Sequence, residues 1–166
     1  MYDYVDKIIN YFPMKIIKSN TALNPYGNNI LKKGNRKRMG KKETEEFHNL
    51  VARGMFVAKR AIPDIHQTVA VLSNRVKEPN KVDWQKLLRM IKYLNGENKK
   101  YLTMSAYDLK VIKWYLDASF SVHLYFKSHT RAIMTIGKGA TKSVSEKQKL
   151  NTSIIKESEL VAVDDA

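Results

Sequence analysis

Apolar residues recur at helical spacing through the first part of the chain, and this pattern predicts a series of helices. The first covers residues 1–12 and ends at Pro13, because proline cannot continue a helix. The second covers residues 42–61. Its stripe of apolar or small residues consists of Thr44, Phe47, Leu50, Val51, Gly54 and Ala58.

Two further helices follow a proline-containing break. Pro63 and Asp64 suit the start of the third helix, which Pro79 ends. Asp83 is the predicted N-cap of the fourth helix, and Asn95-Gly96 closes it. The predicted core face of that helix consists of Trp84, Leu87, Leu88, Ile91 and Leu94.

The apolar period becomes strand-like in the last third of the chain. Strands are predicted over residues 109–120, 132–136 and 140–146, with a turn at 137–139. A last helix is predicted over residues 153–166. The face that it would bury consists of Ile155, Glu159, Ala162 and Val163.

Helices followed by strands and a final helix predict an α+β fold. We expect an N-terminal segment with a basic linker over residues 1–42 and a helical module over residues 43–104. Residues 105–166 are expected to form a small sheet with a helix.

Charge adds a prediction about partners. Thirty Lys and Arg stand against sixteen Asp and Glu, a formal net charge of +14, which favours nucleic acid over an acidic membrane surface. The chain has no cysteine, which excludes a disulfide framework, a zinc knuckle and a thiol nucleophile. No apolar run reaches the length of a membrane span. We therefore expect a soluble intracellular protein, with cytoplasm and nucleus both open and no indication of oligomeric state.

Two basic features have a functional and a structural interpretation. The stretch 32–42 is either a phosphate-binding arm or nuclear import signal, or a solvated linker. Lys86, Arg89 and Lys92 lie three residues apart on the polar face of the fourth helix. They would either follow a phosphate backbone or form an ordinary solvated face. The four histidines show no metal-ligand spacing, and we interpret His66 and His129 as structural.

A set of short motifs between residues 59 and 96 carries a family resemblance. The motifs are Arg60, Pro63-Asp64-Ile65, Ala70, Arg75, Pro79, Trp84, Arg89, Tyr93-Leu94 and Gly96. In this order they resemble the thumb and connection of copia-type retrotransposon reverse transcriptases, part of the Pol polyprotein. The resemblance implies that the template–primer is bound by Arg60, Arg75, Lys86, Arg89 and Lys92.

Residues 113–165 are similar to the start of the ribonuclease H domain in the same family. The matching motifs are KWYLDASFSVH, FKSHT, KGA, KQKLNT and ESELVAVDD. The resemblance implies a truncated ribonuclease H-like sheet and helix, in which Asp117 and Glu159 match two of the carboxylates that hold Mg²⁺. Two-metal hydrolysis needs three or four acids from separate elements. Asp164-Asp165 cannot supply the third, because they point away from Glu159 on the same helix.

Three hypotheses follow from these observations. The preferred one is a fragment of a copia-type Pol protein that is inactive alone, binds no Mg²⁺ stably and retains affinity for nucleic acid. Such a fragment lacks the polymerase aspartates and the third ribonuclease H carboxylate. The second is a ribonuclease H acting on RNA–DNA hybrids once another polypeptide completes it. The third is a basic nucleic-acid-binding module recruited by a host.

Overall fold

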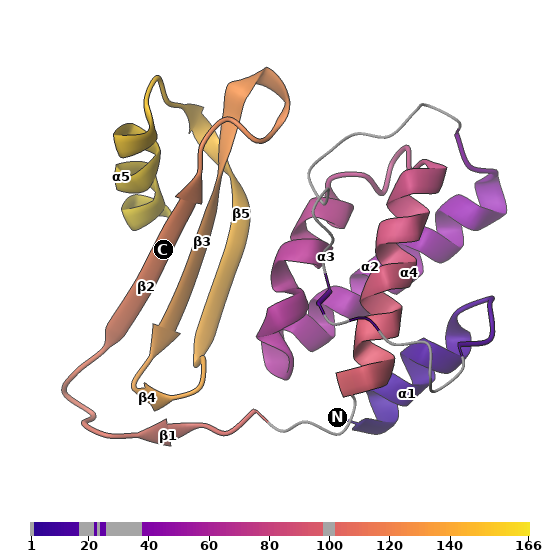
Figure 1. Cartoon of the computed structure of the whole chain (residues 1–166), viewed down its shortest axis with the longest axis horizontal. Coiled ribbons are helices and arrows are strands. Elements are labelled where there is room, and N and C mark those ends of the chain that lie inside the picture. Colours follow the sequence, from indigo (N-terminus) through magenta and orange to yellow (C-terminus); the bar gives the residue numbers. More distant parts are fainter. Residues whose placement is uncertain (1, 17–21, 23, 26–37, 98–101) are drawn as a thin grey trace. The chain divides into compact units, whose positions relative to one another are not determined.

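The computed structural model describes residues 2–16, 22, 24–25, 38–97 and 102–166 and has a mixed α+β fold, which confirms the predicted class (Figure 1). The chain divides into two compact units, Met1–Tyr101 and Leu102–Ala166. The first unit is helical and the second contains the strands, with a division close to the expected one at residue 105. Most of the basic stretch 32–42 lies outside the described residues.

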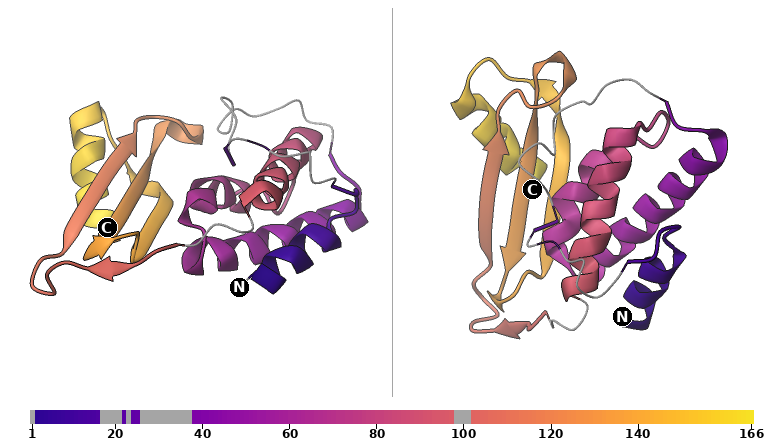
Figure 2. Two further views of the ribbon diagram at one scale, coloured as in Figure 1. Left: turned by 60° about the horizontal axis from the view of Figure 1, so that its bottom comes forward. Right: turned by 45° about the vertical axis from the view of Figure 1, so that its right-hand side comes forward.

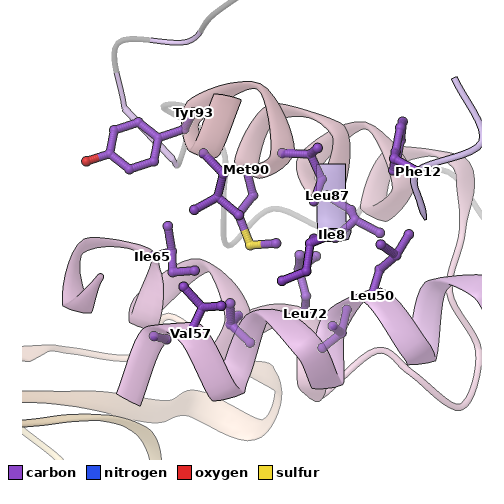
Figure 3. Close-up of a cluster of buried hydrophobic side chains, with 14 of the residues drawn as sticks. Ile8, Phe12, Leu50, Val57, Ile65, Leu72, Leu87, Met90 and Tyr93 are labelled. Carbon is purple, nitrogen blue, oxygen red and sulfur yellow. The ribbon is translucent and has the colours of Figure 1, made fainter. Parts of the chain in front are cut away.

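The first unit contains α1 (Tyr2–Tyr11), α2 (Lys41–Arg60), the short 3₁₀ helix η1 (Pro63–Ile65), α3 (His66–Ser73) and α4 (Lys81–Glu97). Their apolar faces meet in one core, part of which Figure 3 shows. Its fully buried side chains include Ile8, Phe47, Leu50, Ile65, Leu72, Leu87, Met90, Ile91 and Leu94. The helical period of the sequence thus correctly identified most of this core.

The third helix is shorter than predicted, because polar side chains at its end bond back to its own backbone. The Ser73 hydroxyl donates to the Val69 carbonyl at 2.8 Å, and the Asn74 amide donates to the Ala70 carbonyl at 2.9 Å. Such bonds compete with continuation of a helix. The chain turns after Ser73, and Val76 packs against the core from this turn and not from the helix.

The N-cap of α4 is Asn80, and the prediction of Asp83 for this role is wrong. Asn80 Oδ1 accepts from the backbone N–H groups of Val82 at 2.8 Å and Asp83 at 3.0 Å. Asp83 Oδ2 in return accepts from the backbone N–H of Asn80 at 3.2 Å. This reciprocal arrangement is a capping box, with Asp83 in its third helical position. The sequence signal was ambiguous because Asn and Asp are both preferred N-caps.

The second unit contains β1 (Ser105–Ala106), β2 (Lys113–Ser119), η2 (Leu124–Phe126), β3 (Lys127–Thr135), β4 (Gly137–Lys138), β5 (Lys142–Asn151) and α5 (Ile155–Asp165). The strands β2, β3 and β5 form an antiparallel sheet in that order, and β1 pairs with β4 (Figure 2). The predicted first strand began too early. Asp108 turns the chain there, and its side chain accepts from the Lys110 N–H at 2.9 Å. The other two strands are longer than predicted.

Helix α5 covers one face of the sheet through small and polar residues. The Thr130 hydroxyl donates to Asp165 Oδ2 at 2.9 Å, and the Gln148 amide donates to the Ser158 carbonyl at 2.7 Å. Ser158 and Ala162 are the buried residues of the helix. The predicted buried face was therefore wrong apart from Ala162, since the side chains of Ile155 and Val163 are 58% and 61% exposed.

The two units differ in what they bury. Among the described residues of the second unit, the buried apolar side chains are those of Ala132 and Ala162. Its other buried residues are polar: Ser128, His129, Thr130, Thr135, Ser145, Gln148 and Ser158. The first unit therefore has much the larger hydrophobic contribution to stability.

Candidate nucleic-acid interface and carboxylate positions

The basic row on α4 does not form a uniform exposed face. The side chain of Lys86 is only 10% exposed, and its Nζ lies 3.7 Å from Asp83 Oδ1. Burial lowers the pKa of Lys86, the Asp83 carboxylate opposes this effect, and the nearby charge of Arg75 adds to it. In this structure the ammonium group is directed to Asp83 and not outward.

The other two residues of the row are more accessible. Arg89 is exposed, and its Nε and Nη2 donate to Asn24 Oδ1 at 3.3 and 3.0 Å. Lys92 is half-buried one turn further along. Because an amide oxygen carries no net charge, the positive charge of Arg89 is not neutralised by Asn24.

The remaining predicted nucleic-acid-binding residues lie at two separate places. Arg75 is half-buried just after α3, close enough to Lys86 to lower its pKa. Arg60 is the last residue of α2, and its guanidinium lies 4.8 Å above the centroid of the Phe56 ring. Arg75 thus lies within electrostatic range of Lys86, whereas Arg60 belongs to α2.

Sequence reasoning missed Arg53. Its guanidinium lies 4.2 Å above the centroid of the Tyr11 ring, which belongs to α1. The signal in the sequence was the spacing of Arg53, Phe56 and Arg60, which places all three on one side of a helix. It was overlooked because the resemblance motif begins only after Arg53.

The charge excess lies almost entirely in the helical unit. Residues 1–101 contain 21 Lys and Arg against 9 Asp and Glu, whereas residues 102–166 contain 9 against 7. Charge alone therefore gives only the first unit a strong attraction for a polyanion.

Asp117, the first predicted metal ligand, is paired with a cation. It lies in β2 directly opposite Arg131 in β3, and the Arg131 guanidinium donates to Asp117 Oδ2. Both side chains are accessible, at 59% and 38% exposure. A guanidinium bound to this carboxylate competes with any divalent ion for the same oxygen.

The fold does not place Glu159, the second predicted ligand, on the same face of the sheet as Asp117. Thr130 bonds to Asp165, so the Thr130 side chain points to the face that α5 covers. Side chains alternate along a strand, and therefore Arg131 and its partner Asp117 point to the opposite face. Glu159 is exposed on α5 itself. No group of three or more acids and histidines in the described part of the chain is placed to hold a metal ion.

The two histidines interpreted as structural are both buried. His129 Nε2 lies 2.9 Å from the Ser145 hydroxyl, and His129 Nδ1 lies 2.8 Å from His123 Nε2. Burial and the charge of Lys59 lower the pKa of His66. Both ring nitrogens of His129 are therefore within hydrogen-bond distance of a partner inside the fold.

None of the helices in the described part of the chain combines the length and apolar character that a bilayer span needs. Comparison of the chain with protein-family models, with curated proteins and with solved structures finds no match.

Proposed function

We propose that this chain is a fragment of a copia-type retrotransposon Pol protein that binds nucleic acid through its helical unit and does not cleave RNA by itself. The observation that carries the binding proposal is the charge distribution, with 21 basic against 9 acidic residues in residues 1–101. A surface of this kind attracts the phosphate backbone without regard to base sequence.

The family part of the proposal is supported by the motif residues and by one contact between them. The Tyr93 hydroxyl donates to Asp64 Oδ2 at 2.9 Å, which joins the Pro63-Asp64-Ile65 motif to the Tyr93-Leu94 motif. The two motifs lie far apart in the sequence, so a shared structural role gives a physical reason for their joint occurrence.

The proposed lack of cleavage is supported by the positions of the acids. Hydrolysis by two divalent ions needs carboxylates that converge on ions roughly 3.5–4 Å apart. Asp117 is paired with Arg131 and lies on the face of the sheet away from α5, which carries Glu159.

A second candidate is a ribonuclease H that another polypeptide completes. It is favoured by uncovered apolar side chains in the second unit, among them Leu109, Tyr115, Leu160 and Val163, which are 80%, 61%, 71% and 61% exposed. Apolar side chains that gather in one exposed patch are typical of a surface that a partner covers, and Leu160 and Val163 lie three residues apart on α5. This candidate requires that the partner supply acids and displace Arg131 from Asp117.

The test is binding and cleavage of one labelled RNA–DNA hybrid by the full chain. We expect binding whose log K falls linearly with log[salt], by about 0.9 per phosphate contacted. We expect no hydrolysis in Mg²⁺ or Mn²⁺, with Asp117→Asn indistinguishable from the parent chain. Absence of binding at low salt would contradict the binding proposal, and cleavage abolished by Asp117→Asn would establish the enzyme instead.

A further inference from the structure

Two arginines on α2 are stacked on aromatic rings at the surface where α2 meets α1. Arg53 lies 4.2 Å above the Tyr11 ring and Arg60 lies 4.8 Å above the Phe56 ring. Phe56 also contacts Tyr4, with ring centroids 5.1 Å apart and planes tilted by 59°. The figures show α1 lying along α2 (Figure 2). Cations and aromatic rings therefore alternate along this surface.

Arg53, Phe56 and Arg60 of α2, together with Tyr11 of α1, form a strip along the surface of the helix. Residues 53, 56 and 60 lie on one side of α2, at spacings of three and four residues. Seven residues of α-helix rise about 10.5 Å, which is the separation of the Arg53 and Arg60 Cα atoms along the axis. Two arginines at this spacing can contact different phosphates of one nucleic-acid backbone.

Stacking positions each guanidinium without neutralising it. A ring face interacts with the plane of the guanidinium, and the N–H groups at its edge remain able to bind phosphate oxygens. Within the described residues neither Arg53 nor Arg60 forms a salt bridge with a carboxylate. The rings are only partly covered, at 41% exposure for Tyr11 and 42% for Phe56.

Other charges near the strip leave it positive. Helix α1 contributes Asp3 and Asp6 together with Lys7, and α2 adds Lys59 beside Arg60. Over α1 and α2 together, six cations stand against five carboxylates, and the three glutamates of α2 lie in its first two turns, at least seven residues from Arg53. The cations nearer the strip, Lys7, Arg53, Lys59 and Arg60, outnumber Asp3 and Asp6 of α1. An anionic occupant is favoured, and two separated guanidinium groups favour one that presents several phosphates along a backbone.

We infer that Arg53 and Arg60, stacked on Tyr11 and Phe56, bind the phosphate backbone of a double-stranded nucleic acid. This inference rests on the proposed function and assigns the phosphate contacts to the α1–α2 surface, whereas the sequence placed most of them on α4. Because the ring faces hold arginines and not bases, the strip binds duplexes without base preference and does not select single strands.

The experiment compares the salt dependence of duplex binding in the parent chain and in three double variants of the full chain. In Arg53→Gln/Arg60→Gln two phosphate contacts disappear, so the slope of log K against log[salt] falls by about 1.8. Between 50 and 200 mM salt, this variant therefore loses about tenfold less affinity than the parent chain does. The control Lys138→Gln/Lys156→Gln removes two charges from the second unit and leaves the slope unchanged. Arg53→Lys/Arg60→Lys keeps the charges but not the planar stack, and binds more weakly than the parent chain with the same slope.

The outcomes separate this inference from the function on which it rests. If the parent chain fails to bind duplex at low salt, the proposed function fails. If the parent binds and Arg53→Gln/Arg60→Gln keeps its slope, the function stands and the strip is overturned. Tighter binding of single strands than of duplex would also overturn it. Circular dichroism and Trp84 fluorescence establish that each variant is folded. If Arg53→Gln/Arg60→Gln does not fold, Arg53→Lys/Arg60→Lys provides the comparison with the parent chain.

Discussion

Asp117 and Arg131 face each other across β2 and β3, and the guanidinium of one donates to the carboxylate of the other. The position expected to hold a metal ion is thus occupied by a cross-strand ion pair. The pair lies on the sheet face that α5 leaves uncovered, where water screens both charges. Its contribution to stability is small, because exposed ion pairs contribute little to folding.

A double-mutant cycle of Asp117→Asn and Arg131→Gln measures that contribution. We expect a coupling free energy of about 0.2–1 kcal/mol, as for exposed and cross-strand pairs. Urea unfolding of the four forms gives the value. A coupling of several kcal/mol would mean that the pair is far less solvated than its exposure indicates.

Asn80→Ala removes the N-cap of α4. The loss of the two bonds to the N–H groups of Val82 and Asp83 is expected to lower the free energy of unfolding by about 0.5–2 kcal/mol. The matched control is Asn49→Ala, at an exposed interior position of α2, where alanine is neutral or slightly stabilising. Equal effects of the two substitutions in denaturant unfolding would argue against the cap.

Gly54 lies where α2 meets α3 and α4. A Cβ added at Gly54 would lie 3.1 Å from Met90 Cε and 3.2 Å from Val69 Cγ2. Gly54→Val is expected to destabilise the chain by about 1–3 kcal/mol through overpacking. Ala52→Val, at an exposed position of the same helix, should cost less than about 0.7 kcal/mol. Thermal or urea unfolding compares the two, and a tolerated valine at Gly54 would show that the helices separate easily.

His66 makes stability depend on pH. Burial, and to a smaller extent the charge of Lys59, lower the pKa of His66 below its ordinary value of 6.5. As the pH falls below 6.5, the unfolded state therefore takes up the proton before the folded state does, and the free energy of unfolding decreases. The contribution is fully present above pH 6.5. Urea unfolding between pH 5 and 8 should show a smaller decrease in His66→Gln than in the control His48→Gln, whose site is exposed.

The two tryptophans report on the two units separately. Trp84 stacks on Phe12 in the helical core, with ring centroids 5.5 Å apart, whereas Trp114 lies on β2. Each tryptophan is followed alone, Trp114 in the variant Trp84→Phe and Trp84 in the variant Trp114→Phe. We expect the Trp114 signal to change at a lower urea concentration than the Trp84 signal. The reason is the smaller apolar core of the second unit. Coincident transitions would indicate one cooperative structure and contradict this expectation.

Sequence reasoning was most successful in the helical unit. The stripe from Phe47 to Ala58 and the core face of α4 follow from the helical period, which depends only on neighbours within two turns. Its errors lay at ends of elements, such as Ser73 and Asn80, where individual side-chain hydrogen bonds decide the boundary. The buried face of α5 was missed for a related reason, because Ser158 and Ala162 are small and carry no strong apolar signal.

By itself, the sequence determined the α+β class, most of the helical core and the basic character of the chain. These properties depend on local period and on composition. Only the tertiary structure decided that Lys86 is covered beside Asp83, that Arg53 stacks on Tyr11 and that Asp117 is paired with Arg131 away from α5. Each of these contacts depends on packing or strand register, which sets the direction of a side chain and the charge that it meets.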